Sequence, residues 1–293
     1  MHLGLLGLGL RIGIVGSSSG NGHPFSWAAL INGYAPNRLA TVPFARIREY
    51  LRPEVCRFDT TARVTHVWSS RVGEAEAIAD FAKVENPCNN LEELIDGVDA
   101  IIHARDDYPN TPYFARLYRQ SMKPVLFDKP LAMSKDAFSE YTIHDPRFQR
   151  TLTGSALRFD PIFRELRRRG PQTRLIKAWS AGPWEVYGLH LIEPILEVVG
   201  YQRALNTANT LLSRSRKVVT FNLSGGPTLR LEMALEGTSE FRFDFDGLKV
   251  SLLDPTKAFV GFLRAFFALA RGQSDPEEPD RTAKALELLW KGA

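Results

Sequence analysis

One lysine follows a short apolar run and is placed where it could transfer a proton. Lys129 stands in Phe127-Asp128-Lys129-Pro130, directly after the strand predicted at Pro124–Phe127. In a parallel α/β sheet, a residue at the carboxyl end of a strand points toward the place where ligands bind. Partial burial beside another cation lowers the pKa of a lysine toward the range that suits proton transfer. A surface lysine is the alternative for this residue taken alone.

A histidine lies in the aromatic stretch Trp184–Pro194. His190 and Glu193 are three residues apart, so on a helix they share a face and the carboxylate can orient the imidazole. Tyr187 and Trp184 precede them and are candidates to stack on a sugar ring. A satisfied core histidine and ordinary aromatic packing are the alternatives here.

A glycine-rich loop follows the strand predicted at Arg11–Val15 and precedes a helix predicted at Phe25–Tyr34. Strand, glycine turn and helix are the context of a dinucleotide-binding fingerprint, because the bare backbone and the helix N-terminus approach the pyrophosphate. The spacing is not Gly-x-Gly-x-x-Gly, and a plain strand-to-helix turn is the alternative. The expected cofactor contacts in this loop are Gly16, Ser17, Ser18, Gly20, Asn21 and Gly22. The similar run Gly4–Gly9 has no strand before it and is not counted.

The end of the next predicted strand, Val64–Trp68, bears on the type of nucleotide. It continues into Ser69-Ser70-Arg71 rather than into an acidic residue. Two hydroxyls and a guanidinium suit the 2′-phosphate of NADP, because arginine binds phosphate in a fork and stacks on adenine. We therefore expect NADP, with NAD as a possibility and a serine helix cap as the alternative. Further expected cofactor contacts are Ala104, Arg105, Lys129 and Pro130.

The elements that must position these residues fall into two classes. Strand and helix patterns alternate in the first half, which predicts an N-terminal Rossmann domain with a doubly wound parallel sheet. The stretch Ala35–Arg63 is longer than one crossover needs and is interpreted as an insertion. Alternating runs in the second half, with a hairpin turn at Asp246-Gly247, predict a C-terminal α/β domain with a largely antiparallel open sheet. The expected domains are 1–156 and 157–293, with the last helix a candidate to pack back on the first.

Composition narrows the function. The 293 residues are 44% hydrophobic and 24% charged, and the formal charge is +4. Basic residues are interleaved with acids, so no nucleic-acid surface is expected. The exception, Arg167–Arg169, precedes Gly170 and is typical of a helix C-terminus. Neither a metal-ligand spacing nor a membrane segment is present in the sequence. The two cysteines, Cys56 and Cys88, are expected to be free thiols in the cytoplasm.

In this order the motifs resemble the glucose–fructose oxidoreductase/inositol dehydrogenase/MocA (Gfo/Idh/MocA) family, over nearly the whole chain. The most specific item is Asp128-Lys129-Pro130, which is similar to the family's Glu-Lys-Pro signature. Arg11–Gly16 and Val98–Ile102 match in order, and Thr153–Phe159 is similar to the family's strand into the second domain.

The resemblance implies hydride transfer between a nicotinamide and a sugar, polyol or related hydroxy compound. It implies Lys129 and His190 as the acid/base pair, with Glu193 at the acidic position after the histidine. Arg158, Trp184 and Tyr187 are the expected substrate contacts. Val186 stands where the family has an aspartate, and Glu185 is one place off.

Two other functions stay open. The chain is a nucleotide-binding sensor without catalysis if the missing aspartate marks lost chemistry. It is a glycosidase-type enzyme if NAD stays tightly bound and is oxidised and reduced in turn. The expected partners are a small carbohydrate-like substrate and further copies of the chain, as a homodimer or homotetramer by analogy with the family.

Overall fold

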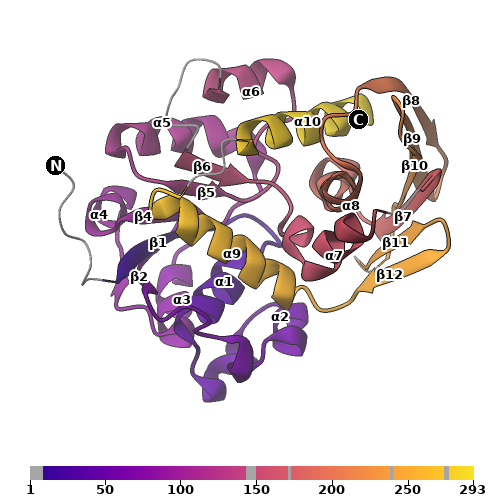
Figure 1. Cartoon of the computed structure of the whole chain (residues 1–293). Coiled ribbons are helices and arrows are strands. Elements are labelled where there is room, and N and C mark those ends of the chain that lie inside the picture. Colours follow the sequence, from indigo (N-terminus) through magenta and orange to yellow (C-terminus); the bar gives the residue numbers. More distant parts are fainter. Residues whose placement is uncertain (1–8, 143–149, 171–172, 238–239, 274–276) are drawn as a thin grey trace. The chain divides into compact units, whose positions relative to one another are not determined.

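The computed structural model describes residues 9–142, 150–170, 173–237, 240–273 and 277–293. They form two compact units (Figure 1). The described residues of the first unit lie within Met1–Asp128, His144–Leu152 and Leu263–Asp275. Those of the second lie within Lys129–Ile143, Thr153–Phe262 and Pro276–Ala293. Most of the run Gly4–Gly9 falls outside the described residues.

The first sheet has the strand order β3-β2-β1-β4-β5-β6. Its pairs β1–β2, β1–β4, β4–β5 and β2–β3 are all parallel. The strands are β1 (Leu10–Gly16), β2 (Ala62–Ser69), β3 (Asn86–Pro87), β4 (Ala100–His103), β5 (Val125–Phe127) and β6 (Thr151–Thr153). The strand order reverses between β1 and β4, and ligands of such sheets bind outside the carboxyl ends at this switch point. The predicted doubly wound sheet is confirmed.

The helices of this region follow the predicted alternation. They are α1 (His23–Asn32), α3 (Glu74–Ala82), α4 (Leu91–Gly97) and α5 (Thr111–Ser121). The predicted insertion between α1 and β2 contains the short helix α2 (Ala45–Tyr50) and the 3₁₀ turns η1 (Pro36–Thr41) and η2 (Pro53–Val55). Helix α1 is apolar around nearly its whole circumference, and its residues from Pro24 to Ile31 are buried.

The second sheet has the order β12-β11-β7-β10-β9-β8, and of its pairs only β7–β10 is parallel among the described strands. The strands are β7 (Leu175–Ala181), β8 (Leu205–Leu212), β9 (Arg216–Leu223), β10 (Thr228–Ala234), β11 (Phe241–Phe245) and β12 (Leu248–Leu252). The largely antiparallel sheet is confirmed. Asp246 and Gly247 both have positive φ, 49° and 96°, as the predicted hairpin turn requires.

One face of this sheet packs on helices of the same unit. Alternate residues of β9 and β10, such as Phe221 and Leu231, are fully buried. They share one apolar core with side chains of α7 (Pro161–Arg169), α8 (Trp184–Val199) and α10 (Glu278–Lys291), which lie beside the sheet in Figure 1. The remaining helices are α6 (Lys135–Thr142) and α9 (Thr256–Ala270). Helix α7 ends with Arg167–Arg169 before a left-handed Gly170, as predicted.

The structure corrects one expectation and adds three strands, β3, β7 and β8. Thr153–Phe159 is not one strand, because β6 ends at Thr153 and Ala156–Phe159 is a 3₁₀ turn capped by the Ser155 hydroxyl. Residues 86–87 pair with β2 as a short edge strand that was not predicted. Strands β7 and β8 were not predicted; β8 is mostly exposed, so it has no apolar alternation to reveal it.

Two smaller expectations concern the thiols and the membrane. Cys56 and Cys88 are free cysteines, and burial raises the pKa of each thiol to about 11. None of the helices in the described ranges is long and apolar enough to span a membrane.

Candidate active site

The loop between β1 and α1 has an open side and a closed side. Gly20 has φ +79°, and an added Cβ would meet nothing within 4 Å. Gly22 lies against the insertion, where an added Cβ would be 2.5 Å from Cδ1 of Ile47. The glycines therefore keep one side of the loop free of side chains and let the other side pack closely on α2.

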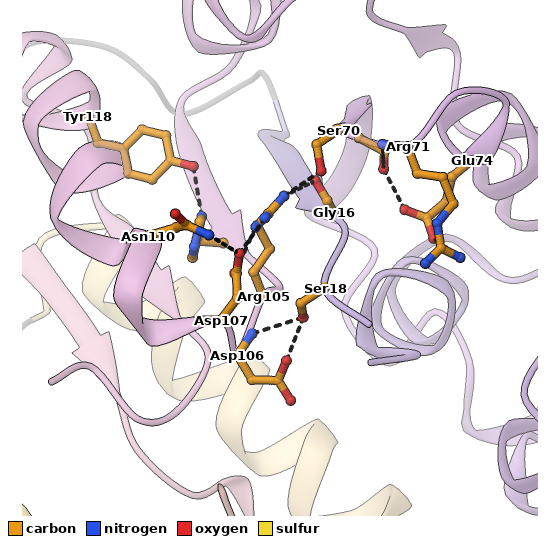
Figure 2. A network of polar contacts seen from close by, with 12 residues as sticks. Gly16, Ser18, Ser70, Arg71, Glu74, Arg105, Asp106, Asp107, Asn110 and Tyr118 are labelled. Carbon is orange, nitrogen blue, oxygen red and sulfur yellow. Dashed lines mark hydrogen bonds and ion pairs between the residues drawn. The ribbon is translucent and has the colours of Figure 1, made fainter. Parts of the chain in front are cut away.

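Arg105 connects the carboxyl ends of three strands (Figure 2). Its guanidinium donates to the Gly16 carbonyl at 3.2 Å and to the Ser70 hydroxyl at 2.8 Å. Nε donates to Asp107 at 2.9 Å, and the guanidinium carbon lies 4.9 Å from the Phe114 ring centroid. Hydrogen bonds from Arg105 hold the pKa of Asp107 below its usual value in spite of burial. Arg105 thus belongs to the frame of the loop, with its charge balanced by Asp107.

Ser18 of the loop contacts a second acid, Asp106. The Ser18 hydroxyl donates to Asp106 at 2.5 Å and accepts from the Asp106 amide at 3.2 Å. Figure 2 shows this pair beside Arg105. Ser17 and Ala104 are buried, and the Ala104 amide donates to the Val15 carbonyl at 3.0 Å. The structure therefore brings together most of the cofactor contacts expected after β1 and β4.

An acid that the sequence reasoning missed lies at the end of β2. The Ser69 hydroxyl donates to the Glu74 carboxylate, and a Cβ on Gly16 would lie 3.1 Å from Glu74 Oε2. Arg71 is 57% exposed and its Nη1 lies 3.8 Å from Glu74, which is only 7% exposed. The signal in the sequence was an acid in the first turn of α3. Because α3 follows β2, the side chain of that acid reaches back to the end of β2.

A second missed group joins the start of α1 to the end of β5. Asn21 Nδ2 donates to Asp128 Oδ2 at 2.9 Å, and His23 Nδ1 lies 2.6 Å from the same oxygen. The His23 ring stacks on Trp27 with the centroids 4.5 Å apart. Because an ionised carboxylate only accepts hydrogen bonds, Nδ1 of His23 carries the proton. Asp128, which replaces the family's glutamate, thus orders the loop and the imidazole together.

The second unit brings Lys129 and His190 to one aromatic cluster. Lys129 is 3% exposed, and its Nζ lies 5.6 Å from the centroid of the Tyr187 ring. The His190 ring lies 6.0 Å from Tyr187 and 4.9 Å from Phe241, centroid to centroid. Helix α8 carries both Tyr187 and His190, whose rings contact each other. Phe241 comes from β11 and was not foreseen.

His190 is held through a serine. The Ser155 hydroxyl lies 2.6 Å from His190 Nδ1, and the Ser155 amide donates to Glu193 Oε2 at 2.6 Å. All three residues are buried. The carboxylate of Glu193 therefore reaches the imidazole by way of Ser155, rather than through the direct pairing that a spacing of three suggests.

Two of the three expected substrate contacts are committed to partners inside the unit. Arg158 is 5% exposed, its Nε lies 3.3 Å from Glu193, and its Nη1 donates to Glu278 at 3.2 Å. Trp184 is 2% exposed and donates from Nε1 to the Leu289 carbonyl at 2.9 Å. Tyr187 is half-buried. Pro130 is buried next to Lys129.

Burial sets the charges of this cluster. One guanidinium faces two carboxylates, and Glu278 is the one that takes hydrogen bonds from two of its nitrogens. Burial therefore raises the pKa of Glu193 to about 8, although Arg158 opposes the shift. Glu278 and Glu193 raise the pKa of Arg158 well above its usual value against the cost of burial. Within the described ranges, no group of three His, Cys, Asp or Glu side chains could hold a metal ion.

Comparison of the sequence with known families and proteins finds no match, whereas comparison of the structure with solved structures finds many. No protein-family model matches the sequence. No curated protein matches it either. Solved structures do match over nearly the whole chain, at sequence identities between 12% and 14%, and this likeness shows a shared fold.

Three of these structures are representative. A Gfo/Idh/MocA family oxidoreductase from Vibrio cholerae has a TM-score of 0.68 at 14% identity, covering 96% of each chain. Myo-inositol 2-dehydrogenase from Lactobacillus plantarum has a TM-score of 0.70 at 13% identity, covering 96% of this chain and 95% of the other. The WlbA dehydrogenase from Thermus thermophilus, in complex with NAD and UDP-GlcNAcA, has a TM-score of 0.64 at 13% identity, covering 96% and 94%. The chain therefore has the two-sheet fold of the Gfo/Idh/MocA oxidoreductases, as the resemblance implied.

Proposed function

We propose that this protein is an NAD-dependent oxidoreductase that transfers hydride between the nicotinamide and a carbon of a sugar, polyol or related hydroxy compound. The observation that carries the proposal is the cluster of Lys129, His190 and Tyr187. A buried amine and an imidazole around one aromatic ring are a proton-handling pair beside a surface for a sugar ring. Lys129 lies two residues after the end of β5, which pairs with β4, a strand at the switch point of the Rossmann sheet.

The first unit fits a dinucleotide. Gly20 has a positive φ and faces open space, and the loop Gly16–Gly22 leads into a helix N-terminus that can receive a pyrophosphate. Ser17, Ser18 and Asn21 are the polar groups of this loop that would contact the pyrophosphate. The dehydrogenases with the same fold include one solved with NAD and UDP-GlcNAcA, which supports both the cofactor class and the substrate class.

Glu74 favours NAD over NADP. A carboxylate at the end of the second strand accepts hydrogen bonds from ribose hydroxyls, whereas it repels a 2′-phosphate. Arg71, on which the expectation of NADP rested, is mostly exposed and already has Glu74 as its neighbour. Ser69, Ser70 and Glu74 would therefore bind the adenosine ribose of NAD.

Different residues would bind the substrate and transfer its proton. The bound cofactor supplies the hydride acceptor or donor. Lys129 and His190 hold or move the proton of the substrate hydroxyl, and Tyr187 and Phe241 cover the substrate with aromatic surface. Glu193 and Arg158 lie behind them and support Ser155. Without the family's aspartate at Val186, proton transfer depends on Lys129 and His190 alone.

The direct test is titration of the purified protein with NADH and NADPH, followed by nicotinamide fluorescence. We expect NADH to bind more tightly than NADPH. The supernatant of acid-precipitated protein is assayed for released nucleotide, because tightly held NAD would block the titration and indicate the glycosidase-type alternative. Protein that is free of nucleotide and binds neither form would contradict the proposal.

Turnover is then measured with a panel of sugars and polyols, using Lys129→Ala and Lys129→Arg. We expect both variants to lose turnover while NADH affinity stays within about threefold, because the amine acts on the substrate proton. NADH binding with no turnover of any compound by the wild type would indicate the sensor instead. Full activity in Lys129→Ala would remove Lys129 from the mechanism.

A further inference from the structure

We infer that Ser155 is a positioning residue that keeps neutral His190 in the tautomer with its proton on Nε2. The inference rests on the proposed function for its catalytic meaning, although the tautomer itself does not depend on it. It follows from the hydrogen-bond inventory of one buried hydroxyl.

The Ser155 hydroxyl has one proton and two lone pairs. One lone pair accepts the Leu157 amide at 3.1 Å, which caps the 3₁₀ turn Ala156–Phe159. Within the part of the chain that is described, the proton has one acceptor in reach, His190 Nδ1 at 2.6 Å. Ser155 is fully buried, so water does not offer a second acceptor.

The opposite arrangement leaves a buried donor without a partner. If Nδ1 of His190 carried the proton, both lone pairs of Ser155 would accept hydrogen bonds and its own O–H would be unsatisfied. A buried donor without an acceptor costs more than any single hydrogen bond gains, so the O–H donates to Nδ1. In neutral His190 the proton therefore lies on Nε2.

This tautomer separates the roles of the proton-handling pair. The lone pair of neutral His190 is occupied by Ser155, and Nε2, on the far edge of the ring, offers an N–H. His190 is then a hydrogen-bond donor to the substrate oxygen, and Lys129 is the group that takes the proton. In the oxidising direction the substrate O–H proton would go to the Lys129 amine, a bound nicotinamide would accept the C–H hydride, and the new carbonyl oxygen would keep the hydrogen bond from Nε2.

His23 shows the contrast within the same chain. Its Nδ1 lies 2.6 Å from the Asp128 carboxylate, which cannot donate, so the Nδ1 proton stays on the ring. The two histidines are thus held in opposite tautomers by an acceptor in one case and a donor in the other. This difference makes His23 an internal reference for the test.

The test is nitrogen NMR of the whole protein carrying ¹⁵N-labelled histidine, without cofactor or substrate, at about two pH units above the usual histidine pKa. The sequence has six histidines, and His190→Gln and His23→Gln identify the two sets of signals. We expect a protonated Nε2 in His190 and a protonated Nδ1 in His23. A protonated Nδ1 in wild-type His190 would overturn the inference, whether or not the protein binds NAD.

Ser155→Ala removes the donor and should release His190 into a mixture of tautomers, while Ser155→Thr restores the hydroxyl and the Nε2 form. Asp160→Ala is the matched control, because Asp160 caps α7 through the Ile162 amide at 3.0 Å and loses a cap without touching His190. An unchanged His190 tautomer in folded Ser155→Ala would also overturn the inference.

Kinetics give an independent readout with a substrate found by the panel. We expect Ser155→Ala to lower kcat by about tenfold, the equivalent of one hydrogen bond, with KM changed less. His190→Gln keeps an N–H donor that cannot take a proton, so it should retain more turnover than His190→Ala. Equal loss in the two variants would show that His190 moves the proton itself.

Discussion

The Nε atom of Arg158 lies 3.3 Å from Oε2 of Glu193, and the same guanidinium is bonded to Glu278. The single positive charge of Arg158 therefore lies between two buried carboxyl groups. Since burial of an unbalanced negative charge is costly, the less fully paired acid, Glu193, holds its proton into the neutral range. This relationship makes the support of Ser155 and His190 sensitive to pH.

Glu193 should make stability fall as the pH rises. Its folded pKa of about 8 lies above the ordinary 4.5, so its contribution is fully present below pH 4.5 and is lost as the pH rises through about 8. The loss is about 1.4 kcal/mol per pH unit in this window. Glu193→Gln, which is neutral throughout, should lose less stability than the wild type between about pH 5 and pH 8.

Thermal unfolding midpoints at the two pH values measure this difference. Glu197→Gln is the control, because Glu197 lies on the same helix and pairs with the exposed Arg167. Parallel pH dependence in the wild type and Glu193→Gln would show that Glu193 is ionised in the folded protein at neutral pH.

His103 should make stability fall as the pH falls, the opposite of the effect of Glu193. It is buried at the end of β4, its Nδ1 lies 2.9 Å from the Tyr118 hydroxyl, and burial lowers its pKa from 6.5 to about 3. The stability that comes from neutral His103 is present above pH 6.5 and is lost as the pH falls toward about 3. Replacing both polar groups, in His103→Phe/Tyr118→Phe, should reduce this acid sensitivity.

The midpoint of thermal unfolding is compared between about pH 7 and pH 5, where the His103 contribution changes by about 1.4 kcal/mol per unit. Tyr118→Phe alone keeps the histidine and should remain as acid-sensitive as the wild type. If the double variant is just as sensitive, other groups cause the acid loss.

Glu74 should decide between the two nicotinamide dinucleotides. Its carboxylate is nearly buried beside Ser69 and Gly16, where a 2′-phosphate would meet a like charge. A charge pair at this range is worth about 1 kcal/mol or more, so Glu74→Gln should improve NADPH affinity relative to NADH by on the order of tenfold. Fluorescence titration of both nucleotides gives the ratio of the Kd values.

Arg71→Ala serves as the companion variant. It should leave NADH affinity nearly unchanged, because the side chain is exposed and its neighbour Glu74 keeps the bond from Ser69. A wild type that prefers NADPH, with a preference that Arg71→Ala removes, would instead support the NADP expectation drawn from Ser69-Ser70-Arg71.

The parts of this protein that follow from local pattern were predictable. The alternation of strands and helices and the hairpin at Asp246-Gly247 both depend on neighbours in sequence. The Lys-Pro signature pointed to Lys129 for the same reason, since its meaning lies in a strand end.

The residues that orient the site were not predictable in this way. Ser155 is 35 residues from His190, and His23 is 105 residues from Asp128. Such pairs depend on how the strands and helices pack, and neither residue type carries a signal of its own. The partners of Arg158 were hidden for a related reason, because its burial between Glu193 and Glu278 becomes visible only in three dimensions.

The contact between Gly182 and Tyr187 should link backbone shape to turnover. Gly182 has φ +115°, and an added Cβ would lie 2.6 Å from Cδ2 and Cε2 of the Tyr187 ring. Gly182→Ala must therefore displace the ring on which Lys129 lies, in addition to straining the backbone. We expect a loss of about 1–3 kcal/mol of stability and at least about a tenfold loss of kcat.

Gly200→Ala separates the two effects. Gly200 ends helix α8 with φ +90°, and an added Cβ would meet nothing within 4 Å, so this variant has the strain without the contact. Thermal unfolding and turnover are measured for both variants. We expect both variants to be destabilised to a similar extent and only Gly182→Ala to lose turnover. Because backbone strain is common to both variants, this result would support a role of the Tyr187 ring in turnover. Equal kcat in the two variants would mean that Lys129 does not need that ring in place.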